Sequence, residues 1–134
     1  MMLKGKLISL ETYTLEKCHE FYKSYIADSM LTDSDYIYDE FKVDKYYLTK
    51  ISDERRCMFS IELDNKTIGE IQLKNIDTIN KVGTLSIVLL SDCVKNRGYG
   101  TEAEKLIINY GFKCLGLKKI LADTTKRNNR SKHV

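Results

Sequence analysis

Apolar and polar positions follow a helical period in the first part of the chain. From Leu15 to Ala27 the apolar side chains recur at helical spacing, and Thr14 is placed to act as the N-cap of that helix. A second helical stripe holds Val43, Tyr46, Tyr47 and Ile51. In front of both, Lys6 to Leu10 alternates weakly, which predicts a short first strand.

An acidic segment separates the two predicted helices. Between Asp28 and Glu40 there are five acids: Asp28, Asp33, Asp35, Asp39 and Glu40. The density of charge and the lack of a helical apolar stripe predict a loop. The chain contains no proline, so the boundaries of these elements are uncertain by about 2–4 residues.

After Arg56 the pattern changes to the period of a β-strand. Cys57–Leu63 and Thr67–Leu73, joined by Asp64-Asn65-Lys66, predict a β-hairpin. Val82–Leu90 predicts a third strand, and its continuous apolar end favours burial on both faces.

The last third begins with two glycines and a strongly periodic helix. The helix follows Gly98-Tyr99-Gly100, Gly116 is its natural terminator, and Lys119–Thr124 predicts one more strand. The apolar stripe of this helix contains Ala103, Leu106, Ile107, Tyr110 and Cys114. Without repeats or linkers, the order of strand, two helices, three antiparallel strands, helix and strand predicts one α/β domain over residues 1–134.

Composition excludes several classes of protein. With 43% apolar and 31% charged residues the chain is globular rather than disordered. The excess of 22 basic over 19 acidic residues gives +3, too small and too evenly spread to indicate a nucleic-acid partner. The longest apolar run, Ile87–Leu90, is far short of the roughly 20 residues that span a membrane, and the amino terminus lacks a secretory signal. We therefore expect a cytoplasmic protein without a membrane partner.

The four cysteines do not form a metal-binding pattern. Cys18, Cys57, Cys93 and Cys114 lie far apart, and the two histidines add no paired spacing. We expect reduced cysteines that act as small apolar residues, and no metal.

The strand-to-helix junction from Val88 to Glu104 is the best candidate for chemistry. The N–H groups at a helix start attract a phosphate, and glycines at positions 98 and 100 allow close approach to the main chain. Lys95 and Arg97 add positive charge. The pattern is neither a Walker loop nor the dinucleotide fingerprint. Glycines needed only for the turn would explain G-x-G alone equally well.

The surrounding sequence resembles a known family. R-G-Y-G-T-E-A, a helix ending in Y-G-F, then L-G-L, a strand and N-x-x-S are similar to the GCN5-related N-acetyltransferase (GNAT) superfamily, and most to its ribosomal-protein N-terminal acetyltransferase branch. The matching material covers about residues 56–134. The resemblance implies an acyl-CoA N-acyltransferase-like fold, with a mixed, mostly antiparallel sheet flanked by helices, and acetyl-CoA as cosubstrate.

The resemblance also implies a cofactor site. The family motif Q/R-x-x-G-x-G/A reads Lys95 to Gly100 here, with lysine at the first position. In the family the backbone after this motif holds the pyrophosphate, strand residues before it offer main-chain groups to the thioester and the pantetheine arm, and N-x-x-S flanks the thiol end. The implied residues are Val88, Leu90, Lys95, Asn96, Arg97, Gly98, Tyr99, Gly100, Thr101, Asn128 and Ser131. Helix capping explains Ser131 equally well, and Glu102 and Glu104 favour the helix dipole without a catalytic role.

The implied reaction is attack of a neutral primary amine on the thioester, which needs a base for the amine. Many relatives carry a glutamate near the positions held here by Thr84 and Leu85, and neither of these can act as a base. Glu70, on the adjacent hairpin strand, is the nearest carboxylate. The alternative for Glu70 is a solvated strand residue.

The family continues past N-x-x-S with a helix, two strands and a tyrosine that protonates the thiolate. Here the sequence ends at Val134, so we expect a shortened chain, a natural fragment or completion by a partner. Strand 119–124 would then be an exposed edge, and pairing of two copies there would form a homodimer.

Two classes of function stay open at this stage. The leading one is an acetyl-CoA-dependent N-acetyltransferase whose acceptor is a protein N-terminus or a small amine such as a polyamine, which the acids of residues 28–40 would attract. A solvated acidic loop is the alternative for those acids. The other class is a non-catalytic acyl-CoA-binding or assembly module.

Overall fold

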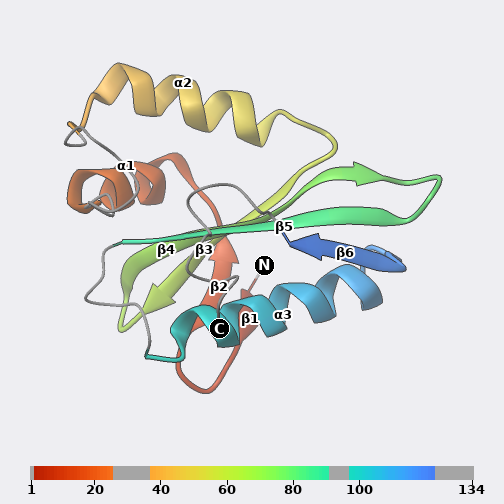
Figure 1. The fold of residues 1–134 in the computed structure, drawn as a ribbon. Coiled ribbons are helices and arrows are strands. Elements are labelled where there is room, and N and C mark those ends of the chain that lie inside the picture. Colours follow the sequence, from red (N-terminus) through yellow and green to blue (C-terminus); the bar gives the residue numbers. More distant parts are fainter. Residues whose placement is uncertain (1, 26–36, 91–96, 123–134) are drawn as a thin grey trace.

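A computed structural model describes residues 2–25, 37–90 and 97–122 of the chain. The predicted residues Lys95, Asn96, Asn128 and Ser131 lie outside the described residues, as do Asp28, Asp33 and Asp35. Within the described ranges there are a sheet and three helices (Figure 1). The elements are β1 (Met2–Lys4), β2 (Ser9–Thr12), α1 (Leu15–Ser24), α2 (Glu40–Ile51), β3 (Cys57–Leu63), β4 (Lys66–Asp77), β5 (Val82–Leu89), α3 (Tyr99–Lys113) and β6 (Lys119–Ala122).

The six strands form one sheet in sequence order, β1-β2-β3-β4-β5-β6. Every neighbouring pair is antiparallel except β5 and β6, which are parallel because α3 connects them. The predicted mixed, mostly antiparallel sheet flanked by helices is therefore confirmed.

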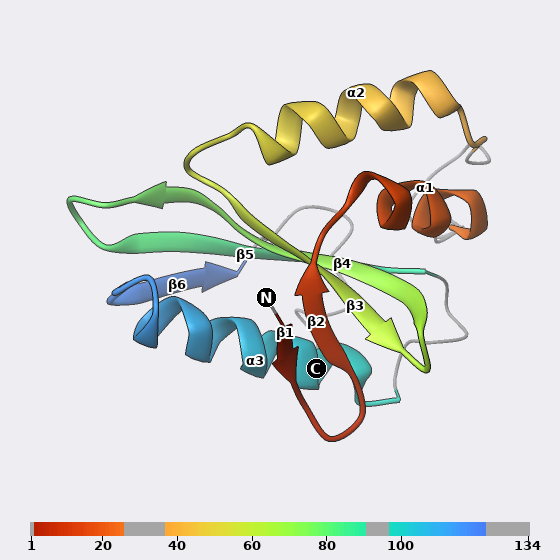
Figure 2. The same cartoon turned by 180° about the vertical axis from the view of Figure 1, so that it is seen from behind.

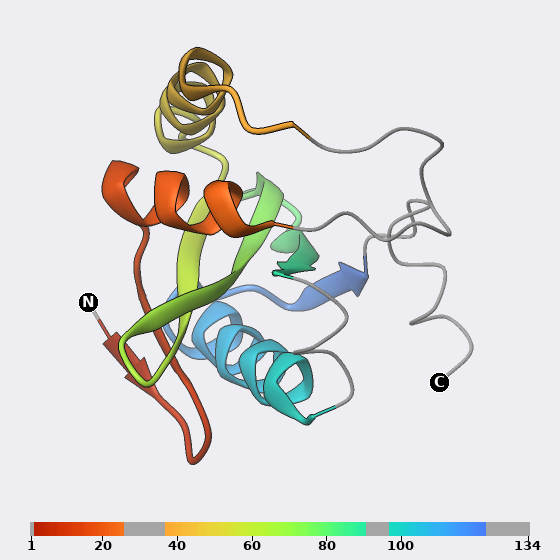
Figure 3. The same ribbon diagram turned by 90° about the vertical axis from the view of Figure 1, so that its left-hand side faces the viewer.

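The helices cover opposite faces of this sheet. Helices α1 and α2 lie on one face, with α1 nearer the strands, and α3 lies on the other (Figure 3). Each face has its own apolar core. Leu73, Leu85 and Ile107 belong to the core under α3, whereas Phe21, Tyr22 and Val43 belong to the core under α1 and α2.

The local signals explain most of the element boundaries. Thr14 caps α1 as predicted, because its hydroxyl accepts the Lys17 N–H at 3.2 Å. Asp64 and Asn65 both have positive φ, the geometry of the two-residue turns that match the twist of a hairpin. Gly116 follows α3 at φ +70°, as a helix terminator should.

Several predicted boundaries were wrong. The single strand predicted at Lys6–Leu10 is a turn between β1 and β2 followed by the start of β2. The predicted acidic loop ends early, because the Asp39 carboxylate accepts the N–H groups of Phe41 and Lys42 and so caps α2, which begins at Glu40. Ile51 and Cys114, assigned to apolar stripes, are exposed because each lies at or beyond the last turn of its helix.

Two further features concern the last strand and the helices. Strand β6 pairs with β5 alone within the described residues, and Leu121 on it is exposed. No helix in the described ranges has the length and apolar character needed to cross a bilayer.

Candidate active site

Helix α3 starts at the end of β5 that lies farthest from β6, below the sheet in Figure 2. Its first intrahelical hydrogen bond runs from the Glu102 N–H to the Gly98 carbonyl at 3.0 Å. The N–H groups of residues 98–101 precede that bond and have no acceptor within the helix. Among the residues that the structure describes, no side chain caps this end either. The helix start thus presents backbone donors and the positive end of its dipole, which suit an anion.

The two motif glycines have different structural reasons. Gly98 has φ +85°, a backbone conformation that other residues rarely adopt. Gly100 is an ordinary helical residue, and a Cβ built on it would lie 3.5 Å from Leu89 Cδ1, a normal contact. The protein itself therefore needs glycine at position 98 but not at position 100. The described fold gives no reason for the absence of a side chain at position 100. Its absence is explained if a ligand binds next to the main chain there.

Glu102 ties the first turn of α3 to the turn between β1 and β2. Its Oε1 accepts the N–H groups of Leu7 at 2.8 Å and Ile8 at 2.9 Å. Burial works against ionisation, but these backbone donors outweigh it and lower the pKa of Glu102. Gly5 allows this contact, because a Cβ there would lie 2.0 Å from the same oxygen. The carboxylate is thus held by β1–β2 and has a structural role.

Within the described residues, the second half of β5 does not pair with β6. The parallel ladder ends at Leu85 opposite Ala122, and the remaining residues of β5 pair with β4. The Leu90 N–H donates to the Ile68 carbonyl of β4 at 2.7 Å. Because main-chain groups alternate along a strand, those of Val88 also face β4, opposite Glu70, whereas those of Ile87 and Leu89 face outward.

This register corrects one prediction. Val88 and Leu90 were expected to offer main-chain groups to the thioester and the pantetheine arm. Their N–H groups face β4, so Leu89 and Ile87 are the residues whose main chain is directed away from β4. The separation of these two strands stays a prediction, because the described part of β6 ends at Ala122, opposite Leu85.

Glu70 is buried and accepts hydrogen bonds from three tyrosines, which come from the β2–α1 connection, from α1 and from α2. The Tyr13 hydroxyl donates to Oε2 at 2.7 Å, and the Tyr22 hydroxyl donates to Oε1 at 2.9 Å. The Tyr46 hydroxyl of α2 also donates to Oε1. Only 1% of Glu70 is exposed. The alternative of a solvated strand residue is therefore wrong.

Burial keeps the tyrosine hydroxyls around Glu70 and the neighbouring Cys18 thiol protonated. Desolvation, and then the charge of Glu70, raise the pKa of Tyr13, Tyr22 and Tyr46 well above their usual value, so all three hydroxyls stay protonated and keep donating. Desolvation also raises the pKa of the Cys18 thiol beside Tyr13 to about 12, which keeps it an unreactive thiol. Tyr46 is the least buried of the three tyrosines.

Sequence reasoning found Glu70 but missed its partners. Tyr22 and Tyr46 were interpreted as members of apolar stripes, and Tyr13 was not singled out. The only signal was composition, since the chain has nine tyrosines against four phenylalanines and no tryptophan. At the positions where relatives carry a glutamate, Thr84 pairs with Lys74 and Leu85 is buried in the core under α3.

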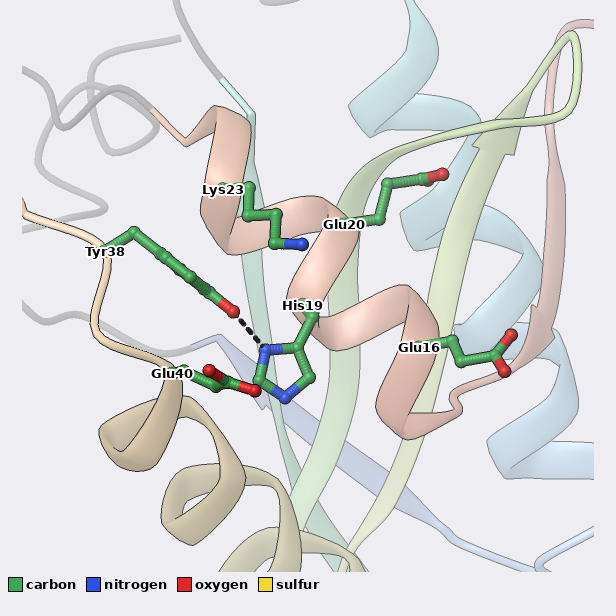
Figure 4. Close-up of a pocket in the computed structure, with 6 residues that line it drawn as sticks. All are labelled: Glu16, His19, Glu20, Lys23, Tyr38 and Glu40. Atoms are coloured by element: carbon green, nitrogen blue, oxygen red, sulfur yellow. Dashed lines mark hydrogen bonds between the residues drawn. The ribbon is translucent and has the colours of Figure 1, made fainter.

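A separate acidic pocket lies on the outer face of α1. It has a volume of about 710 Å³ and is lined by Glu16, His19, Glu20, Lys23, Tyr38 and Glu40 (Figure 4). His19 joins the two helices here, because its Nδ1 lies 2.5 Å from the Tyr38 hydroxyl and its Nε2 lies 2.6 Å from Asp44 Oδ1. The pocket residues of α1 occupy the face opposite Cys18 and Tyr22, so the pocket does not open onto Glu70.

Comparison with known proteins shows which family the chain is similar to. The profile of the acetyltransferase (GNAT) domain matches residues 8–134. Spermidine N(1)-acetyltransferase of Escherichia coli K12 is 27% identical over 88 residues, which make up 66% of this chain and 47% of that protein. The chain thus spans about half the length of the curated relatives it matches.

Solved structures show the same fold at lower identity. RimL, the ribosomal L7/L12 alpha-N-protein acetyltransferase, in complex with coenzyme A, has a TM-score of 0.76 at 11% identity, with 99% of this chain and 79% of that chain covered. MccE, the microcin C7 self-immunity acetyltransferase, in complex with acetyl-CoA and AMP, has a TM-score of 0.73 at 16% identity, with 96% and 77% covered. Because the family profile covers nearly the whole sequence, the chain belongs to the GNAT acetyltransferase family.

Proposed function

We propose that the protein is an acetyl-CoA-dependent N-acetyltransferase that moves an acetyl group to a primary amine. The observation that supports this is the helix start of α3, where backbone donors have no acceptor within the helix and where the described fold does not require the glycine at position 100. The expected cofactor-binding residues within the described ranges are Arg97, Gly98, Tyr99, Gly100 and Thr101, and Lys95, Asn96, Asn128 and Ser131 stay predictions. Acetyl-CoA supplies the activated acetyl thioester.

The chain's own residues would hold the two halves of that cosubstrate. The N–H groups at the start of α3 would hold the pyrophosphate, because they have no other acceptor in the helix. The outward main-chain groups of Ile87 and Leu89 would extend the sheet along the pantetheine arm. An amide so directed can also stabilise negative charge on the thioester oxygen.

We propose that Glu70 removes the amine's proton indirectly. It is too buried to touch an acceptor, but Tyr46 is only half-buried and donates to its Oε1. The amine would pass its proton to the Tyr46 oxygen while the Tyr46 proton moves to Glu70. The neutral amine would then form the C–N bond as the C–S bond breaks, and the proton that the new amide nitrogen must lose would pass through water to the departing thiolate of coenzyme A. Tyr13 and Tyr22 would keep the carboxylate fixed meanwhile.

The acceptor is a protein N-terminus or a small amine such as a polyamine, and the two candidates come from different relatives. RimL is an alpha-N-protein acetyltransferase, and the E. coli relative is a spermidine acetyltransferase. The acids of the pocket on α1 would attract a polycation, but they face away from Glu70. A non-catalytic acyl-CoA-binding module is the alternative function, because Glu70, the candidate base among the described residues, is buried.

Thiol release from acetyl-CoA, measured with a panel of primary amines, tests the proposal. The expected result is acceptor-dependent release of one coenzyme A per acetylated product, confirmed by mass spectrometry. Acetyl-CoA binding by calorimetry without turnover of any amine would favour the module instead.

The role of Glu70 has its own test in the variants Glu70→Gln and Tyr46→Phe. Both should lower kcat/KM by about 100-fold or more, mainly at low pH, where the amine is protonated and most needs a base. Tyr47→Phe is the matched control, because its hydroxyl donates to the Tyr13 carbonyl and not to Glu70. A loss that is the same at every pH would leave water or buffer as the base and Glu70 as a structural residue.

A further inference from the structure

Lys50, in the last turn of α2, lies next to the proposed proton relay. It follows Tyr46 by four residues, so the two side chains project from the same face of the helix. The Lys50 Nζ lies 5.5 Å from the centre of the Tyr46 ring, and the Tyr46 hydroxyl donates to Glu70. The fold therefore brings a primary amine of the chain itself to the tyrosine that would take a proton from the acceptor.

Glu70 is one strand away from the main chain that is proposed to hold the cosubstrate. It pairs with Val88 on β5, and neighbouring strands lie about 4.7–4.9 Å apart. Val88 stands between Ile87 and Leu89, whose outward groups would extend along the pantetheine arm. Tyr46 and Val88 both pack against the core under α1 and α2. The relay is thus next to the expected position of the thioester.

The surroundings of Lys50 favour its neutral form. Desolvation, and then the charges of Arg56 and Lys74, lower the pKa of Lys50. Glu70 and Asp53 act in the opposite direction without cancelling the effect, and Asp53 is itself paired with Arg56 at 3.3 Å. A larger neutral fraction makes the amine a better nucleophile.

Lys50 needs no groove that admits an acceptor, because its amine is already part of the molecule. The side chain is half-buried, and its flexible four-carbon stem lets the amine change position. Among the described residues, no carboxylate forms an ion pair with Lys50. A cation–π contact at a partly exposed site is weak, so Nζ can leave the Tyr46 ring when a thioester is bound.

We propose that Lys50 is a self-acetylation site, which accepts an acetyl group from acetyl-CoA bound to the same chain. This inference rests on the proposed function and adds a modification site to it. Lys50 gives one proton to the Tyr46 oxygen while the Tyr46 proton moves to Glu70. The neutral Nζ then forms the C–N bond as the thioester C–S bond breaks. The proton that the new amide nitrogen must lose passes through water to the thiolate of coenzyme A.

Incubation of the full chain with acetyl-CoA, without any added amine, tests the proposal. The intact mass should rise by the mass of one acetyl group, and peptide mapping should place that group on Lys50. Lys50 should be modified at least about tenfold faster than Lys45, an exposed lysine on the same helix, because a bound thioester acts at a high effective concentration. The first-order rate constant should not depend on protein concentration. A rate constant that rises with protein concentration would mean transfer between chains and would contradict the proposal.

Three variants separate transfer within the site from simple chemical reactivity. Lys50→Arg should lose the modification, and Lys45→Arg, the matched control, should keep it. Gly100→Asp, whose side chain would occupy the place of the pyrophosphate, should lower the rate at Lys50 to the rate at Lys45. If Lys50 were modified equally fast in wild type and in a folded Gly100→Asp protein, the acetyl group would not come from the proposed site and the inference would be overturned.

A measurement without acetyl-CoA tests the amine itself. Labelling of the apo-protein with acetic anhydride over a series of pH values, followed by mass spectrometry, gives the pH at which half of Lys50 is neutral. This midpoint should lie below 10.5, the ordinary pKa of a lysine. A midpoint at or above that value would contradict the proposal, because the amine would then have no advantage as a nucleophile.

The outcomes distinguish the inference from the proposed function on which it rests. If neither Lys50 nor any added amine is acetylated, the proposed function fails and the inference fails with it. If added amines are acetylated while Lys50 stays unmodified, or if other lysines are modified as fast as Lys50, the inference alone is overturned.

Discussion

At the scale of single residues, position 100 separates what the fold needs from what a ligand needs. Gly98 supplies a positive φ, so any substitution there disturbs the turn itself. Gly100 has helical geometry and only normal contacts around its Cα. A substitution at Gly100 therefore tests the ligand site with little disturbance of the fold.

The variant Gly100→Asp should fold and lose acetyl-CoA binding. An aspartate in the first turn of a helix interacts favourably with the helix dipole, so the apo-protein should melt within a few degrees of wild type. Its side chain and its charge would occupy the place of the pyrophosphate. Gly100→Ala is the control, because the family motif admits alanine here, and it should keep its affinity within about threefold while gaining roughly 0.5–1 kcal/mol of helix stability. Calorimetry that finds unchanged affinity in a folded Gly100→Asp protein would contradict the assigned pocket.

The same residues show where sequence reasoning stopped. The anion-binding junction was predictable, because glycines, a buried strand and a periodic helix are all local patterns. Which main-chain groups of β5 face outward was not, because that depends on the register with β4 and on the bond from the Leu90 N–H to Ile68. The burial of Glu70 was also not predictable, because its three tyrosines come from separate segments of the chain.

At the scale of elements, the first two turns of α3 carry two glutamates in opposite environments, Glu102 in the first turn and Glu104 in the second. Glu102 binds two backbone N–H groups of the β1–β2 turn, which lower its pKa. Glu104 is half-buried, and desolvation raises its pKa. The sequence predicted only a dipole contribution for both, because the strand pair that Glu102 holds was itself predicted as one short strand.

The variant Glu102→Gln should be less stable than wild type at neutral pH, and the difference should shrink in acid. A folded-state pKa below the ordinary 4.5 means that the charged form stabilises the fold above that value. This contribution is lost as the pH falls through the lowered pKa. Melting curves at pH 7 and at pH 3 measure the difference.

The variant Glu104→Gln serves as the control, because its stability at neutral pH should change in the opposite direction. Because the pKa of Glu104 is raised, its charge costs stability above the ordinary value, so the amide should match or exceed wild type at pH 7. If Glu102→Gln were less stable than wild type by the same amount at both pH values, the shape of the side chain, and not its charge, would matter at that contact.

At the scale of the whole molecule, most of the sheet could be predicted from the sequence. The strand at its edge, β6, bears on whether the chain forms a dimer. The hairpin of β3 and β4, strand β5, helix α3 and strand β6 all follow local periodicity, and the turn at Asp64-Asn65 fixes the hairpin. Within the described residues β6 is the last strand, and its Leu121 is 44% exposed. An unpaired edge with an exposed apolar side chain favours pairing with another strand.

We therefore expect the 134-residue chain to form a dimer through β6. A two-fold contact between two β6 edges would pair their backbone groups and cover Leu121. Light scattering at micromolar concentration should give twice the monomer mass. Leu121→Lys should give the monomer mass and stay folded, since nearly half of this side chain is exposed in one copy. A monomeric wild type with a cooperative melt would contradict this expectation.

The bonds from Leu7 and Ile8 to Glu102 also set an order of events during synthesis. They join groups 95 and 94 residues apart in the chain. Strands β1 and β2 leave the ribosome before α3 and can pair with each other early, but their connecting turn gains these partners only after residue 102 has emerged and α3 has formed. Contacts of such long sequence separation close late and slow folding. The beginning of this chain is therefore among the last parts to be secured, and it is secured by the helix that would bind the cosubstrate.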